Sequence, residues 1–174
     1  GSYVLGKGFI LTPNEVKHLI EQNAQNKEVL FPYLNGQDLN NQIDQNSTRW
    51  VINFFDWSEE KAKEYPDCYK IIVDKVKPIR TRWKKDKNGN IIEGEYAIRK
   101  PRRIRWWQYA ERADALYHNI ASLDKILVVP LVSKFSTFAF AEVNHSISLQ
   151  KNPLSLARSI YEKQVFLPLL TSLG

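Results

Sequence analysis

Methionine is absent from the 174-residue chain, and cysteine occurs once, at Cys68. One cysteine excludes an internal disulfide, and His18, His118 and His145 are too dispersed to form a metal-ligand spacing with it. Long apolar runs are also missing, and Gly1 to Leu11 lacks the charged start and apolar middle of a signal peptide. We therefore expect no metal site, no membrane segment and a reducing, cytoplasmic setting. The lack of methionine even at the start predicts a processed product or an excised piece of a longer polypeptide.

Motifs that carry catalysis are missing too. The chain has no Gly-x-Gly-x-x-Gly, no Walker loop and no Gly-x-Ser-x-Gly, so nothing predicts a nucleotide cofactor site or a nucleophile elbow. Pro66-Asp67 could begin a metal-dependent nuclease pattern, but no later Asp or Glu is followed by Lys two residues on. Cys68 lies within an apolar helical repeat, which favours a structural thiol over the alternative, a nucleophile. We predict no catalytic residue in this chain.

Positive charge is concentrated in one stretch. From Lys75 to Arg105 twelve Lys or Arg side chains oppose three carboxylates, a surplus of +9, whereas the whole chain carries +6, so the remainder is net acidic. A focused basic patch is typical of a protein that binds a phosphate backbone. The alternative is a solvated charged face, but such faces usually mix both signs of charge.

The apolar pattern predicts an α+β fold with a mixed β-sheet flanked by helices, in a single domain that covers 1–174. Its expected strands lie near four residues, namely Tyr3, Trp50, Ile126 and Phe138. The run from Arg49 to Trp57 is almost entirely apolar, which is typical of a buried central strand.

Turn and cap residues predict the elements between these strands. Thr12 and Pro13 are expected to begin a helix, and Ser58 another, which Pro66 either follows with a new helix or kinks. Asn35-Gly36 predicts a turn, and the polar run from Gln37 to Ser47 an exposed loop.

The basic stretch is predicted to contain a hairpin and a long helix. Asn88-Gly89 is a hairpin signal, although the segment from Arg80 to Ile98 could equally be a mobile loop. The spacing from Pro101 to about Leu123 predicts one helix whose buried face includes Trp106 and Tyr109. Trp107 falls at the flank of that face, where it is either core edge or contact residue.

Several blocks of sequence, in this order, resemble one family. They are Phe9-Ile-Leu-Thr-Pro, Phe31-Pro-Tyr-Leu-Asn-Gly-Gln-Asp-Leu-Asn, Arg49-Trp-Val-Ile-Asn-Phe-Phe-Asp-Trp, Glu64-Tyr-Pro-Asp-Cys-Tyr-Lys, Arg105-Trp-Trp-Gln-Tyr and Val128-Val-Pro-Leu-Val-Ser-Lys-Phe. Between Tyr3 and Val143 the chain resembles the target recognition domain of type IIG restriction-modification enzymes, in which one polypeptide also carries an adenine-N6 methyltransferase and a nuclease. The resemblance ends after Val143, so 143–174 is expected to be a divergent or truncated end.

The resemblance implies a non-catalytic module that reads double-stranded DNA, while methyltransferase and nuclease domains of the parent polypeptide do the chemistry. It implies no cofactor in this chain, because the adenine-pocket and S-adenosylmethionine motifs are absent; the parent would use S-adenosylmethionine, and Mg²⁺ if it cuts. The alternatives are a small nuclease and an RNA- or protein-interaction remnant that uses the apolar tail from Leu167 to Leu173.

Basic residues, one tryptophan and two residues of the shared framework are the expected DNA contacts. They are Arg80, Arg82, Lys84, Lys85, Arg99, Lys100, Arg102, Arg103, Arg105, Trp107, Arg112, Ser133 and Lys134. Residues in the shared blocks are expected to serve as scaffold or phosphate contacts, and base readers are expected in the segment from Arg80 to Arg103.

Overall fold

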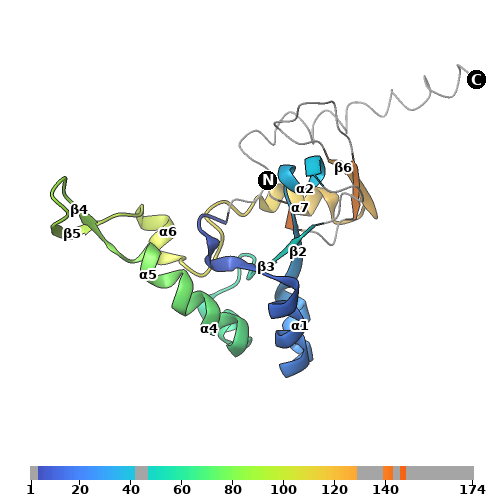
Figure 1. The fold of residues 1–174 in the computed structure, drawn as a ribbon, viewed down its shortest axis with the longest axis horizontal. Coiled ribbons are helices and arrows are strands. Elements are labelled where there is room, and N and C mark those ends of the chain that lie inside the picture. The colour runs from blue at the N-terminus through green and yellow to red at the C-terminus, as the bar shows by residue number, and fades with distance from the viewer. Residues whose placement is uncertain (1–3, 42–46, 129–138, 143–145, 148–174) are drawn as a thin grey trace, which may run out of the picture.

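A computed structural model describes residues 4–41, 47–128, 139–142 and 146–147 of the chain (Figure 1). Short helices and short strands alternate along it, which confirms the predicted α+β class. In chain order, with η for 3-10 helices, the elements are η1 (Lys7–Phe9), β1 (Ile10–Leu11), α1 (Pro13–Gln22), η2 (Ala24–Val29), β2 (Leu30–Leu34), α2 (Gly36–Asn41), β3 (Arg49–Ile52), α3 (Glu59–Lys63), α4 (Pro66–Lys75), α5 (Lys77–Arg80), β4 (Trp83–Lys85), β5 (Ile91–Tyr96), α6 (Lys100–Ile104), α7 (Asp114–Ile120), β6 (Lys125–Val128), β7 (Ala139–Glu142) and β8 (Ser146–Ile147).

The largest sheet has the strand order β1-β3-β2-β8 and is mixed, as predicted. Strand β3 is flanked by antiparallel β1 and β2, so Val51 lies opposite both Ile10 and Phe31, and β8 pairs parallel to β2. The prediction of a central buried strand at Trp50 is confirmed, but the strand ends at Ile52 rather than Trp57. Beyond it Phe55 takes a left-handed conformation with φ of 48°, which an extended strand excludes.

The strands near Ile126 and Phe138 were predicted to belong to this sheet, and that prediction is wrong for the described residues. Strands β6 and β7 pair with each other in a separate antiparallel sheet, with Leu127 opposite Phe140. Val128 packs with Leu34 and Leu39 in a small second core, which joins this sheet to the end of β2 and to α2. The predicted link at Ser133-Lys134, and everything expected of 148–174, lie outside the described residues.

Helix starts follow the predicted caps. Thr12 and Glu15 form a capping box at the start of α1, where Glu15 Oε2 accepts from the Thr12 amide at 2.7 Å. That hydrogen bond is the main cause that lowers the pKa of Glu15. Ser58 caps α3, and Pro66 begins the separate helix α4, so it does not kink a single long one. The strand expected from Tyr3 shrinks to Ile10–Leu11, because Gly8 takes part in the turn η1 and packs directly on the end of α4.

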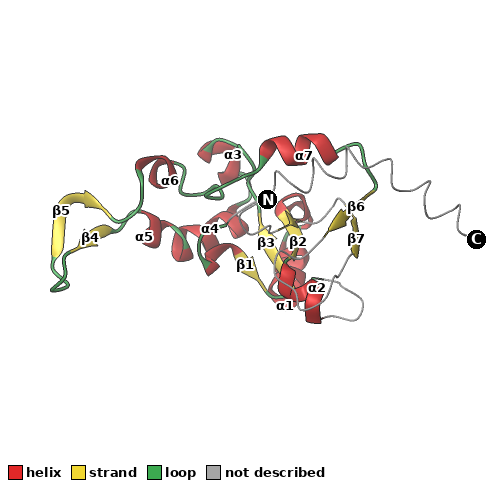
Figure 2. Cartoon of the chain, turned by 90° about the horizontal axis from the view of Figure 1, so that it is seen from above, coloured by secondary structure: helices red, strands yellow, loops and turns green. Residues whose placement is uncertain are grey.

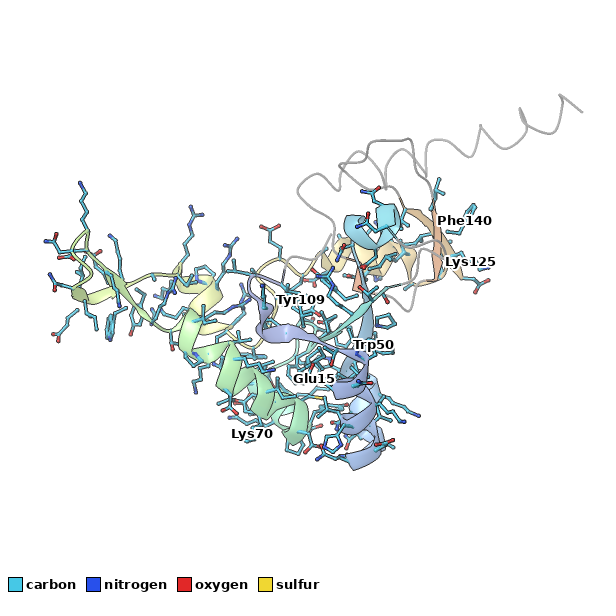
Figure 3. All side chains as sticks on the ribbon, in the orientation of Figure 1. Glu15, Trp50, Lys70, Tyr109, Lys125 and Phe140 are labelled. Atoms are coloured by element: carbon cyan, nitrogen blue, oxygen red, sulfur yellow. The ribbon has the colours of Figure 1, made fainter. Side chains whose placement is uncertain are left out.

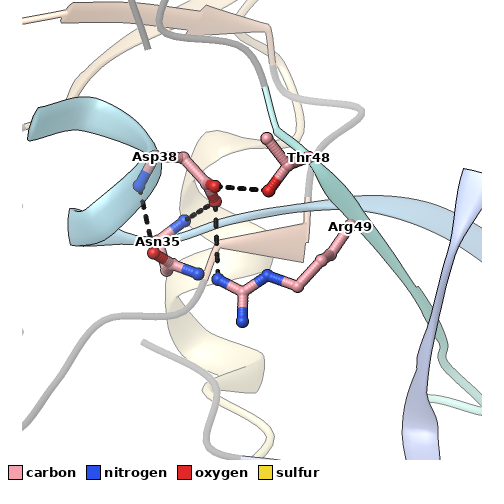
Figure 4. Close-up of polar contacts among 4 residues, drawn as sticks. All are labelled: Asn35, Asp38, Thr48 and Arg49. Carbon is pink, nitrogen blue, oxygen red and sulfur yellow. Dashed lines mark hydrogen bonds and ion pairs between the residues drawn. The ribbon is translucent and has the colours of Figure 1, made fainter. Parts of the chain in front are cut away.

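Helix α2 replaces the turn and part of the loop that were predicted after Asn35. The Asn35 side chain accepts from the Asp38 amide at 3.2 Å, and the Asp38 carboxylate accepts from the Asn35 amide at 3.2 Å, which is a capping arrangement (Figure 4). Buried Asp38 also accepts from Thr48 at 2.8 Å and lies 3.8 Å from the Arg49 guanidinium. The Asn-Gly pair therefore starts a helix, and the Asp38 carboxylate connects that helix to the start of β3.

The prediction of a single helix from Pro101 to Leu123 is wrong. The chain forms the short helices α6 and α7, and the stretch between them is irregular, with Ala113 in a left-handed conformation at φ of 58°. Four consecutive side chains from Trp106 to Tyr109 are buried, each at most 8% exposed. A helix on the surface of a core buries one stripe only, so it cannot bury four residues in succession. An irregular passage of turns can, because it has no fixed exposed face.

The main core joins the sheet to α4 and to this irregular passage. Aromatic rings make up much of it, and Phe54 lies about 6.5 Å or less from the rings of Trp57, Tyr65 and Tyr69. Tyr69 in turn contacts Trp106. The buried residues of this core all lie between Val4 and Tyr109, and β4 and β5 extend away from it (Figures 1 and 2).

Candidate nucleic-acid interface

Strands β4 and β5 form an antiparallel hairpin, which confirms the hairpin interpretation over the loop. Asp86 closes its turn by accepting from the amides of Asn88 and Asn90, both at 2.8 Å, while Gly89 takes a φ of 87°. The hydrogen bond from the Asn90 amide is the main cause that lowers the pKa of Asp86. The hairpin projects from the body of the molecule in both views (Figures 1 and 2). The Asp86 carboxylate is thus occupied by its own turn.

Stacked side chains fix the root of this hairpin. Trp83 and Tyr96 face each other across the strands with ring centroids 4.3 Å apart, and the Arg103 guanidinium lies 3.6 Å from the centre of the Tyr96 ring. Arg103 comes from α6, so this cation–π contact joins the hairpin to that helix. Arg103, a predicted DNA contact, is therefore engaged in packing.

Three cations on the hairpin have no carboxylate partner in the described part of the chain. Lys84 pairs with Glu95 at 2.8 Å, whereas Arg82, Lys85 and Lys87 are exposed and make no ion pair with any described residue. An ammonium or guanidinium group without a partner remains available for an external anion. The hairpin accordingly presents cations on a narrow two-stranded ribbon, and the stick view shows its side chains extending into open space (Figure 3).

A hollow of about 250 Å³ lies beside α6, and we call it the arginine hollow. Its lining residues are Arg99, Pro101, Arg102, Arg105, Gln108, Tyr109, Ala110 and Arg112. All four of these arginines are among the predicted DNA contacts, and the structure brings them together. Gln108 was not predicted, although a polar residue inside an aromatic run was a signal for a special environment.

Two of the four arginines in the hollow have carboxylate partners. Arg102 lies 3.4 Å from Glu111, and Arg112 lies 2.7 Å from Asp114, whose side chain is 57% exposed. Arg99 and Arg105 are exposed and form no ion pair with the rest of the described chain. The hollow therefore has more positive than negative charge around it.

Arg80 is not at the surface, and its predicted role as a DNA contact is wrong. It is 1% exposed, and its guanidinium donates to the carbonyls of Val4 at 2.6 Å, Trp106 at 3.1 Å and Gln108. Burial, and then the positive charge of Arg102, lower the pKa of Arg80 to about 10. Its five N–H donors suit a site where three carbonyls from two segments converge. Arg80 thus joins the start of the chain to the passage between α6 and α7.

Trp107 is likewise part of the interior. It is 8% exposed, and its indole Nε1 donates to the carbonyl of Trp57 at 2.9 Å. Gln108 donates to the same carbonyl at 2.8 Å. The question between core edge and contact is settled in favour of the core. Of the other predicted contacts, Lys100 is exposed on α6 outside the lining of the hollow, and Ser133 and Lys134 lie outside the described residues.

Cys68 is fully buried in α4, and burial is the main cause that raises the pKa of its thiol to about 12. The thiolate is the reactive form, so we expect the folded chain to react with iodoacetamide at pH 8 at least about 100-fold more slowly than a free cysteine. Mass spectrometry after timed alkylation measures this rate. The same chain in denaturant should react at the ordinary rate, and comparable rates in both states would contradict the structural assignment of Cys68.

Within residues 4–41, 47–128, 139–142 and 146–147, no three His, Cys, Asp or Glu side chains gather as ligands for a metal ion. In the same residues no helix has the length and apolar character needed to cross a membrane.

Comparison with known proteins returns no match at any of three levels. No protein-family model, no curated protein and no solved structure matches the chain.

Proposed function

We propose that this chain is a non-catalytic, double-stranded DNA recognition module of the kind that type IIG restriction-modification enzymes join to an adenine-N6 methyltransferase. The observation that carries the proposal is the projecting hairpin, whose cations Arg82, Lys85 and Lys87 have no described carboxylate partner. The sequence blocks that resemble the family support the same assignment. Methyl transfer, and cleavage if the parent cuts, would belong to other domains, with S-adenosylmethionine and Mg²⁺ as their cofactors.

The shape of the hairpin favours DNA over RNA. The major groove of B-DNA admits a two-stranded β-ribbon, whereas the major groove of A-form RNA is too deep and narrow for side chains to read. Lysine and arginine on such a ribbon would neutralise phosphates along the groove, and side chains between them would reach base edges. The cation–π contact between Arg103 and Tyr96 restricts the orientation of the ribbon, which lowers the entropy cost of binding.

Duplex binding across a salt series tests the proposal. If Arg82, Lys85 and Lys87 each contact a phosphate, the variant R82Q/K85Q/K87Q should lower the slope of log affinity against log salt by about 3, because each phosphate contact contributes about 0.9. The matched control is K17Q/K27Q/K63Q, which removes the same charge from exposed lysines of α1, η2 and α3. The control should change the slope by less than 1.

Three outcomes decide against the proposal. Undetectable duplex binding at low salt would contradict the proposal. An unchanged slope of log affinity against log salt in R82Q/K85Q/K87Q would contradict it as well. Mg²⁺-dependent cleavage of plasmid by the purified chain would favour the small-nuclease alternative. Tighter binding to RNA than to DNA of the same sequence would favour the RNA-binding remnant.

A further inference from the structure

We infer that the arginine hollow binds one phosphate group, and that this group is a phosphodiester of a nucleic acid strand. The inference rests on the proposed function for the source of the phosphate. It assigns a second contact point to the chain, separate from the hairpin: Arg103 of α6 packs on the hairpin, while its neighbour Arg102 lines the hollow.

The size and lining of the hollow favour a small anion. Pockets for drug-sized ligands span about 300–1,000 Å³ and are mainly apolar, whereas this hollow has about 250 Å³ and four guanidinium groups around it. Arginine presents N–H donors in a planar fork that matches the oxygen spacing of phosphate and carboxylate. A phosphate has enough oxygens to receive forks from more than one arginine at once.

The arginines of the hollow are available in two different ways. Arg99 and Arg105 form no ion pair with described residues, so they offer their donors without losing a contact. Arg102 and Arg112 are paired with Glu111 and Asp114, whose side chains are 50% and 57% exposed. Exposed pairs of this kind contribute little, so a phosphate can replace a carboxylate at modest cost.

The floor of the hollow is held in place from below. Gln108 donates to the Trp57 carbonyl at 2.8 Å, and Tyr109, labelled in Figure 3, packs edge-to-face on Phe9 with ring centroids 5.3 Å apart. Buried Arg80 donates to the Gln108 carbonyl. A site whose backbone is fixed before the ligand arrives loses less entropy on binding.

Positive charge accumulates around this floor, which also favours an anion. Buried Arg80 donates to the carbonyl of Gln108, which lines the hollow, and the charge of Arg102 contributes, after burial, to lowering the pKa of Arg80. A bound phosphate would offset the repulsion among these guanidinium groups, since opposite charge within a few ångströms favours the charged form of each.

Arginine Nε–H signals in nuclear magnetic resonance spectra of the full chain test the site directly. Titration with inorganic phosphate and with a deoxydinucleotide that has one internal phosphodiester should give saturable shifts at Arg99 and Arg105. The variant R99Q/R105Q should weaken both titrations at least tenfold, while K27Q/K63Q, with the same net charge, should leave them unchanged. The variant R99K/R105K keeps the charge without the forks, and it should bind both probes more weakly than wild type.

Each other outcome overturns a defined part of the inference. Shifts that never saturate, or an equal loss in K27Q/K63Q, would mean that the hollow has no specific site. Saturation with inorganic phosphate alone would overturn the phosphodiester assignment and leave a site for a free anion. The duplex salt series separates this inference from the proposed function. If R82Q/K85Q/K87Q lowers the slope but R99Q/R105Q does not lower it by about 1, the value for one phosphate, only the hollow fails. Saturable dinucleotide binding without duplex binding means that the proposed function fails.

Discussion

Replacing Arg80 by alanine is expected to lower the free energy of unfolding by about 3–5 kcal/mol, because each buried carbonyl that is left without a donor costs roughly 1–3 kcal/mol. The carbonyls of Val4, Trp106 and Gln108 would lose their donor in a site that water does not reach. The lost side chain would also leave a cavity against Phe9, whose ring centre lies 5.2 Å from the guanidinium carbon. Urea unfolding of the folded chain measures the difference.

Two matched variants show whether this effect comes from the three carbonyls. R82A removes an exposed arginine two residues away and should cost less than about 0.5 kcal/mol. R80K keeps a charge, but one ammonium on a flexible stem cannot span three carbonyls from two separate segments, so most of the loss should remain. Equal urea midpoints for R80A and R82A would show that Arg80 is not a structural link.

Local rules in the sequence predict the parts of the fold that neighbouring residues decide. Thr12 and Ser58 cap helices as expected, and of the alternatives left open, Pro66 begins a new helix and Asn88-Gly89 closes a hairpin. Caps and tight turns are settled by hydrogen bonds within a few residues. The helix expected from Pro101 to Leu123 failed for the opposite reason. Its spacing fits a helix, but the core around Trp106 takes four consecutive side chains, and that demand comes from residues distant in sequence.

In the candidate site, too, the sequence predicts what is local and not what depends on distant residues. The basic stretch was evident from charge alone, and the hollow collects Arg99, Arg102, Arg105 and Arg112 from it. Charge alone did not distinguish Arg80 from Arg82, although one is buried and the other exposed. An arginine becomes a structural residue when carbonyls converge on it, and the Val4 carbonyl comes from the start of the chain, 76 positions away. The spacing of residues in the sequence does not predict that contact.

Shortening the hairpin should remove most of the affinity for duplex DNA without changing the net charge. A variant in which residues 84–95 are replaced by a short Gly-Ser-Gly link loses three lysines and three carboxylates together. Trp83 and Tyr96 remain paired, so their stack and the contact with Arg103 can persist. The replacement removes Lys85 and Lys87, two of the three cations without a described carboxylate partner. At roughly 1 kcal/mol for each contact, duplex affinity should fall about 30-fold, as measured by fluorescence anisotropy with a labelled duplex.

The unchanged charge is what makes this variant decisive. A loss of affinity cannot come from a weaker overall field, so it reports the position of the ribbon in a groove. The removed residues are exposed apart from the half-buried Ile92, so urea stability should stay within about 0.5 kcal/mol of wild type. Dinucleotide binding at the arginine hollow should also persist, because none of its lining residues is removed. Full duplex affinity in the shortened chain would mean that DNA contacts lie elsewhere, and the hairpin would then be a solvated extension.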